Sequence, residues 1–432
     1  MGNRKFKILI LILLFIQIGT SQNINFEDLR KDFIDGHIHL QQSDFHINYT
    51  QGLKMIKPPK EIRGQENFYK AFKEKLDDVS LTNLDDYEKL DYHLMQYEIA
   101  LRLERISLEK QWDHNTNLDD SKSIHSIPNG KKWYAYLLKL WVDAKAKPEE
   151  MFRFGLAEIE IVKSNMKRLQ ESSSLSETEF HQYLDDETFF FDSPDDIQKA
   201  FEEIKLKVGV LANDLFPYVS DIPEVKIARG TNKELSHAPA YYSNNTFFYN
   251  VFDKPFNKRQ LRWFYAHEAI PGHHYQSMVN SIVKRTEIQD LFWYPGYVEG
   301  WGAYVEYLGN ELGIFETIYD EYGKWEWDLV RSVRVCMDVA LNYYGWSDAK
   351  AMAFWKEHIK GQDDIALREI NRMKRWPAQV ITYKYGAKMF LELLESAKTK
   401  SDFDFNTFHQ EVLKHGDVPV SVLRKSLSSV MR

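Results

Sequence analysis

The sequence predicts a mostly helical fold with a small β-sheet beside the helix that carries its most reactive side chains. Apolar residues recur at helical spacing over most of the 432 residues, while Gly and Pro number only 20 and 13 and aromatic residues reach 14%. Such a composition is typical of densely ordered chains rich in helix. The exception is 215–262, where short apolar runs flanked by turn formers favour strands.

Residues 1–21 have the pattern of a secretory signal peptide. A basic start at 4–7 is followed by an apolar run of about eleven residues and a small-residue exit. The run is short for a membrane span, and no Cys follows it, which argues against lipid attachment there. An uncleaved anchor is the alternative. We expect a periplasmic or secreted protein with no membrane contact after cleavage. It would be stabilised by its core and any bound metal, because its single cysteine, Cys336, cannot form an internal disulfide.

The charge pattern argues against a nucleic-acid partner. The formal net charge of −8 comes from 64 acidic and 56 basic residues, and the bases form no block. Beyond the signal peptide we expect an N-terminal helical region over 22–130 and a second helical domain, with the active site, over 131–432.

The stretch 22–62 is polar and the least regular part of the chain, with a break at Pro58-Pro59. It contains Asp35-Gly-His-Ile-His39, and Asp-x-His-x-His can open the metal site of an amidohydrolase barrel. Such a barrel needs βα alternation downstream, which the sequence lacks. We interpret the pair as solvated histidines and keep the barrel as a minor alternative.

The middle of the chain shows helix starts and two strands. Two helices are expected between 63 and 112, and helical patterning resumes at 133–141. Pro148 and Pro194, each followed by two acids, mark helix starts. We expect these helices to run to about 172 and 211. Strands are expected at 225–228 and 247–250, where they could pair with an extended peptide. After 262 we expect mostly helix.

The chemistry concentrates in 265–274, where three histidines and a glutamate lie between His267 and His274. Two imidazoles, one carboxylate, an open position for water and a second carboxylate as base are what a hydrolytic zinc site needs. In the usual His-Glu-x-x-His helix the second ligand falls four residues on, but position 271 is Pro. On a straight helix the sixth residue points about 240° away and the seventh lies about 10 Å along the axis. A distortion at Pro271-Gly272 is therefore required, and we favour His273 over His274 as ligand.

Two glutamates downstream complete the pattern. Glu299 and Glu306 are seven residues apart, on one helix face. We expect Glu299 to be the carboxylate ligand and Glu268 the general base. Glu306 is either an acceptor for a ligand histidine or a solvated charge. Tyr383 is either a hydrogen-bond donor to an oxyanion or a core tyrosine.

These residues resemble a known bacterial family. The segments 267–274 and 299–306, an Arg-x-x-Arg-x-x-x-Asp motif at 331–338, and Trp-Pro-Ala-Gln-x-x-x-Tyr-Lys-Tyr-Gly at 376–386 are similar to the family named domain of unknown function 885. That family is in turn similar to the gluzincin metallopeptidases.

The resemblance implies a two-lobed helical metallopeptidase-like fold with a substrate channel between the lobes. It also implies zinc held by His267, by His273 or His274, and by Glu299, with Glu268 as base. The resemblance also implies that three further side chains lie at the substrate, namely Tyr383, Arg331 and Arg334.

The sequence departs from the family at two points. After Asp338 the family usually has Thr-Gly-Leu-His, whereas this chain has Val-Ala-Leu-Asn342. An amide can donate a hydrogen bond but cannot supply a proton, so we expect Asn342 to face the scissile carbonyl with Tyr383 and to alter specificity or activity. The N-terminal lobe is also short.

The sequence thus predicts a zinc-dependent hydrolase of short peptides. The alternative is a catalytically silent protein that keeps the metal and binds a peptide or another ligand. The presence of Glu268 favours the enzyme, because a binding protein needs no base beside its ligand histidine. The substrate, the cleavage position and the oligomeric state are left open by the sequence.

Overall fold

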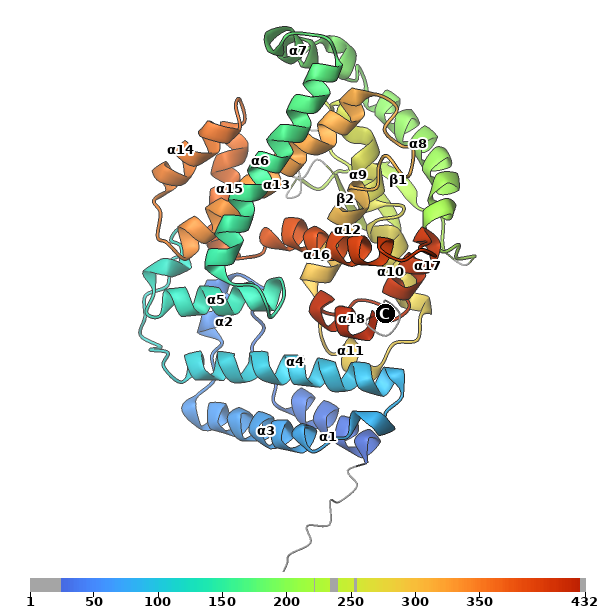
Figure 1. The fold of residues 1–432 in the computed structure, drawn as a ribbon. Helices are drawn as coiled ribbons and strands as arrows, with labels where there is room; N and C mark the ends of the chain where they lie inside the picture. Colours follow the sequence, from blue (N-terminus) through green and yellow to red (C-terminus); the bar gives the residue numbers. More distant parts are fainter. Residues whose placement is uncertain (1–24, 221, 234–239, 252–254, 428–432) are drawn as a thin grey trace, which may run out of the picture.

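The computed structural model describes residues 25–220, 222–233, 240–251 and 255–427. Within these ranges the chain is mostly helical with one three-stranded sheet, as predicted (Figure 1). The expected signal peptide lies outside the described residues. Among the described helices, none combines the length and hydropathy needed to cross a bilayer.

The N-terminal part is more regular than its polar composition suggests. The prediction of an irregular stretch was wrong, because two helices form there, each started by an asparagine whose side chain accepts a backbone N–H two residues on. Two longer helices follow, as predicted. The four are α1 (Phe26–His39), α2 (Tyr49–Lys54), α3 (Pro59–Asp77) and α4 (Asp86–Glu109).

The His-x-His pair lies at the end of α1, not on a strand. His37 Nδ1 is 2.8 Å from the Tyr69 hydroxyl, and His39 is exposed. An amidohydrolase barrel needs this motif on its first strand. The helical position therefore removes the barrel alternative.

Proline and serine start the middle helices where the sequence predicts. Pro148 occupies the first turn of α6, and the Ser193 side chain accepts the backbone N–H of Asp196 at the start of α8. The α8 helix runs four residues further than expected, and a short α7 precedes it. The bounds are α5 (Gly130–Trp141), α6 (Pro148–Ser172), α7 (Glu177–Leu184) and α8 (Pro194–Leu215).

The sheet contains the two predicted strands and a third strand that lies between them in the sequence but at the edge of the sheet. Its order is β1-β3-β2, with β1 (Lys226–Arg229) parallel to β3 (Thr246–Tyr249) and β2 (Ala240–Ser243) antiparallel to it. The Phe247 ring packs on Phe201 of α8 and on Tyr265, at 4.6 and 6.1 Å between centroids. The sheet is thereby fixed beside the helix that ends in His267-Glu268.

The rest of the chain is helical, as expected, and two helix pairs organise it. The central α13 lies along α6, and α12 lies against α16 (Figure 1). The bounds are α9 (Leu261–Glu268), α10 (His273–Ile282), α11 (Glu287–Asp290), α12 (Pro295–Glu306), α13 (Ile318–Asn342), α14 (Asp348–His358), α15 (Asp363–Arg375), α16 (Ile381–Lys398), α17 (Phe405–Leu413) and α18 (Val420–Leu427). Short 3-10 turns lie at Leu81–Asn83, Ile124–Ser126, Glu187–Phe189 and Lys258–Gln260.

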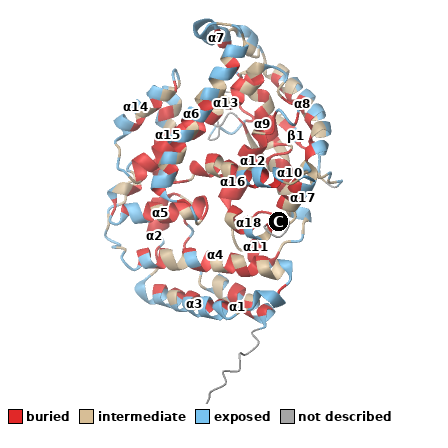
Figure 2. Cartoon of the chain, viewed as in Figure 1, coloured by how far each residue is buried: buried red, intermediate tan, exposed pale blue. Residues whose placement is uncertain are grey.

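One main hydrophobic core runs through the described chain, from Phe26 to Leu427. It includes residues on both sides of the expected boundary at 130. Figure 2 shows buried residues through the middle of the molecule, with largely exposed outer faces on α3, α7 and α14. The candidate site is therefore built on elements that share one core.

Candidate metal centre

The chain leaves the helical path between His267 and His273. The α9 helix ends at Glu268, and α10 begins at His273. Gly272 is in close contact with the preceding turn, since a Cβ there would lie 1.8 Å from the carbonyl oxygen of His267. Only glycine fits this position. The distortion predicted at Pro271-Gly272 thus takes the form of a break between two helices.

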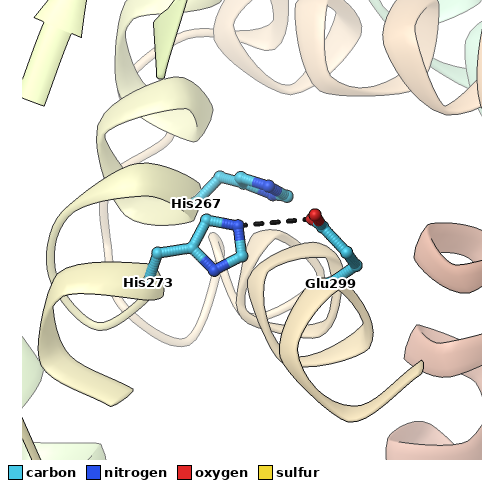
Figure 3. Close-up of side chains that lie close together, drawn as sticks. All are labelled: His267, His273 and Glu299. Atoms are coloured by element: carbon cyan, nitrogen blue, oxygen red, sulfur yellow. Dashed lines mark ion pairs between the residues drawn. The ribbon is translucent and has the colours of Figure 1, made fainter. Parts of the chain in front are cut away.

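This break brings His273 next to His267, and α12 supplies Glu299. One ligand atom from each of the three residues lies within 4.8 Å of the others. His273 Nε2 is 3.4 Å from Glu299 Oε2, and Figure 3 shows the three side chains directed toward one another. Ligand atoms of a tetrahedral zinc ion, at about 2.0–2.1 Å from the metal, lie roughly 3.3 Å apart. The donor set and its spacing fit such an ion.

Glu306 fixes the orientation of His267 from behind. His267 Nδ1 donates to Glu306 Oε1 at 2.6 Å, which leaves Nε2 as the nitrogen free to bind a metal. Glu306 is fully buried. Of the two alternatives for Glu306, the structure excludes the solvated charge, because the carboxylate is buried and accepts from His267, the candidate ligand.

The structure corrects the expectation that Arg331 lies at the substrate. Its side chain is buried, and both terminal guanidinium nitrogens donate to Glu306, with Nη2 at 2.7 Å from Oε1. Arg331 therefore neutralises the carboxylate that holds His267, and its buried side chain presents no solvent-exposed face to a ligand.

The structure also removes His274 as a candidate ligand. Its Nε2–H donates to the Pro223 carbonyl at 2.7 Å, and its Nδ1 accepts from the Tyr242 hydroxyl at 3.0 Å. Both ring nitrogens are thus occupied, and the neutral ring has no lone pair left for a metal. His274 ties α10 to the β-sheet, whereas His273, one residue earlier, points to Glu299.

Gly302 leaves the room that the two histidines occupy. A Cβ on this residue of α12 would lie 2.9 Å from His267 Cε1 and 3.0 Å from His273 Cε1. The rings therefore pack directly on the helix backbone. The Glu-Gly-Trp-Gly motif thus provides the carboxylate of Glu299 and, three residues later, a glycine that leaves space for the two imidazole rings.

The electrostatics of the group favour charged carboxylates. Burial raises the pKa of Glu299, but hydrogen bonding and charge from His273 outweigh it and lower the pKa overall. Burial likewise opposes ionisation of Glu306, and Arg331 and His267 outweigh it. The pKa of His273 is raised, because Glu299 and Glu268 outweigh the effect of burial.

Two further expected residues lie beside the three ligands. Glu268 ends α9 next to His267 and is half-buried. The ring of Tyr383, also half-buried, stacks on His267 at 6.3 Å between centroids. Burial raises the pKa of the Tyr383 phenol, and the negative charge of Glu299 acts in the same direction. A protonated phenol is available there as a hydrogen-bond donor.

The structure corrects the expectation for Asn342. This residue is fully buried at the end of α13, and its Nδ2 donates to the Met373 carbonyl at 3.0 Å. It also contacts Asp338, whose carboxylate accepts from the Tyr134 hydroxyl and the Ala378 N–H. A donor engaged inside the core cannot be offered to a substrate.

Sequence reasoning missed two residues, Arg372 and Gln379. Arg372 Nη2 lies 2.6 Å from Gln379 Oε1 and 3.4 Å from the Tyr383 hydroxyl. Arg334, which the sequence did single out, is buried and lies 5.3 Å from the Tyr383 ring centroid. A signal was available, because Gln379 and Tyr383 belong to the Trp-Pro-Ala-Gln-x-x-x-Tyr motif, and Arg372 lies one turn before it.

Comparison with known proteins gives the fold and the family. A candidate lipoprotein of unknown function from Shewanella oneidensis superposes with a TM-score of 0.72 and 17% identity, over 93% of this chain and 99% of that one. A candidate lipoprotein from Colwellia psychrerythraea gives a TM-score of 0.65 and 21% identity, over 86% of this chain and 69% of that one. No curated protein matches. The model of a family described as bacterial protein of unknown function (DUF885) matches residues 107–427, and the chain belongs to this family.

Proposed function

We propose that the protein is a zinc-dependent peptidase acting on short peptides. The observation that carries the proposal is the convergence of His267, His273 and Glu299, with Glu306 holding the first histidine in the tautomer that presents Nε2. Two imidazoles and one carboxylate, with a further carboxylate beside them, are the donor set of hydrolytic zinc sites.

The chain's own residues divide the chemistry between them. A zinc ion, when bound, would polarise the scissile carbonyl and make a water molecule more acidic. Glu268, next to His267, would take the proton from that water and return it to the leaving amine. Tyr383 would donate a hydrogen bond to the oxygen that gains charge, a contribution of roughly 3–4 kcal/mol for a well-placed donor.

The protein would act outside the cytoplasm and bind its substrate in a channel between two lobes. The similar solved structures are described as candidate lipoproteins, and the first 21 residues have the pattern of a signal peptide. We place the protein outside the cytoplasm, in the periplasm or secreted, with a gluzincin-like substrate channel between two lobes.

The test separates metal binding from catalysis. Glu268→Gln should keep the zinc and lower peptide hydrolysis by about a hundredfold or more, because only the base is removed. His267→Ala should lose both zinc and activity. His37→Ala, in α1, is the matched control and should lose neither. Zinc content is measured by elemental analysis and turnover with short fluorogenic peptides. Zinc retained by wild type with no turnover on any peptide would support the silent binding protein instead.

A further inference from the structure

Three arginines surround Tyr383, and they differ in how fully their charge is balanced. The guanidinium carbons of Arg331, Arg334 and Arg372 lie 5.9, 5.3 and 5.9 Å from the centroid of the Tyr383 ring. The same ring stacks on His267. The cationic group is thus separated from the metal ligands by a single aromatic side chain.

Arg331 is paired with Glu306, but Arg334 and Arg372 share one carboxylate. Glu369 Oε2 lies 3.1 Å from Arg334 Nη1 and 3.8 Å from Arg372 Nη1. Two guanidinium groups therefore have one negative charge between them. Burial lowers the pKa of Arg334 even with Glu369 beside it, which agrees with a shortage of counter-charge.

A second carboxylate, that of Glu299, also acts on Arg372 through its charge. It is directed to His273 and is committed to the metal in the proposed site. With a metal bound, Glu299 no longer offers the arginines a full negative charge. The excess positive charge then lies around Tyr383, next to His267.

Arg372 is held mainly by an uncharged partner, because the Glu369 carboxylate that it shares with Arg334 is 3.8 Å from its Nη1. Its Nε and Nη2 both donate to the amide oxygen of Gln379, at 3.1 and 2.6 Å, and an amide carries no charge. The Arg372 side chain keeps 29% of its surface exposed, in contrast to buried Arg331. The Arg372 guanidinium is therefore positioned by an uncharged amide and partly exposed to solvent. Such an arrangement is suited to binding a carboxylate.

We propose that Arg372, supported by Arg334, binds a carboxylate of the peptide substrate close to the scissile bond. This inference rests on the proposed peptidase function and names its substrate class. The carboxylate is that of a free C-terminus or of an acidic side chain near it. Gln379 and Glu369 are positioning residues, since they hold the two arginines and do not meet the substrate.

The experiment compares three short peptides of otherwise identical sequence, one with a free C-terminal carboxylate, one amidated, and one amidated with an acidic side chain at the last residue. Wild-type holoenzyme should cleave a carboxylate-bearing peptide with kcat/KM about tenfold or more above that of the plain amide. Arg372→Gln should abolish that preference, so that kcat/KM for the carboxylate-bearing peptide falls to that of the plain amide. Arg372→Lys should restore part of it. The peptide that is preferred identifies the source of the carboxylate.

Arg375→Gln, an exposed arginine at the end of the same helix, is the matched control and should keep the full preference. Equal loss on all peptides in Arg372→Gln, or no preference in wild type, would overturn the inference.

A binding measurement keeps the two proposals apart. Zinc-loaded Glu268→Gln is titrated calorimetrically with the free-acid and amidated peptides, with and without Arg372→Gln. Carboxylate-selective binding that disappears with Arg372→Gln supports the inference even if no peptide is cleaved, in which case only the peptidase proposal fails. Equal affinity for both peptides overturns the carboxylate site whether or not the protein is a peptidase.

Discussion

At the scale of single residues, two adjacent histidines have opposite roles. His273 points to Glu299, and His274 is bonded through both nitrogens to Pro223 and Tyr242. We expect His273→Ala to lose bound zinc, because it removes one of three ligands. His274→Ala should retain zinc and lower the melting temperature, since it leaves the Pro223 carbonyl and the Tyr242 hydroxyl unpaired. Zinc content after dialysis and thermal unfolding check this, and zinc loss in His274→Ala alone would refute the ligand assignment.

A second residue-scale prediction concerns Gly302. A methyl group there would press on both His267 and His273, so Gly302→Ala should weaken zinc binding by about tenfold or more while the helical circular dichroism stays unchanged. Gly209→Ala is the control, because a Cβ at that position of α8 meets nothing within 4 Å. Competition with a zinc chelator measures both affinities. Equal zinc affinities would mean that the imidazole rings of His267 and His273 can shift without weakening zinc binding.

Residue types and spacing predicted part of the site and left part unpredictable. His267, His273 and Glu299 followed from what zinc requires and from the break that Pro271-Gly272 imposes. The position of Arg331 did not follow, because its partner Glu306 is distant in sequence and either residue alone is compatible with a substrate role. Arg372 was missed because it lies one turn before the Trp-Pro-Ala-Gln-x-x-x-Tyr motif and not within it, although that proximity was a signal.

At the scale of elements, α13 links the site to the core. Residues spaced three or four apart lie along one side of it: Arg331 behind His267, Arg334 beside Tyr383, and then Asp338 and Asn342 inside the core. The sequence predicted helix here and after 262 in general, but not that all four of these polar side chains are buried. It missed α1, whose apolar residues are interrupted by charged ones, and also the six-residue α2 and the short strand β2.

Asp338 gives this helix a pH dependence. Burial raises the pKa of its carboxyl to about 7 in spite of hydrogen bonds from Tyr134 and Ala378, whereas the unfolded value is about 3.9. Between these values the folded protein holds a proton that the unfolded chain has released. The contribution of Asp338 to the free energy of unfolding therefore falls as pH rises from about 4 to 7.

Asp338→Asn removes this titration. Relative to wild type, the variant should gain stability as the pH is raised from 4 to 7, up to roughly 1.4 kcal/mol for each unit of pKa shift. Denaturant unfolding across this range measures the difference. Asp402→Asn, at an exposed position between α16 and α17, is the control. A constant offset between variant and wild type would show that Asp338 is ionised throughout.

At the scale of the whole molecule, the continuous core joins the expected region 22–130 to the rest. We expect the chain without its first 21 residues to unfold in one calorimetric transition, with no separate unfolding of the N-terminal helices. Zinc should raise the transition temperature, by the equivalent of about 2.7 kcal/mol at a hundred times its dissociation constant. His273→Ala should remove this rise, and His274→Ala should keep it. Two resolved transitions would show that the boundary near 130 separates independent units.

The buried carboxylate of Glu306 has a consequence for the life of the protein. Glu306 accepts hydrogen bonds from His267 and Arg331 within the interior. The orientation of the His267 ring is therefore set by folding and not by the binding of an ion. For the proposed zinc enzyme this predicts that removal of the metal leaves a folded protein with its binding site already formed. Such an apoprotein would regain activity on addition of zinc without refolding.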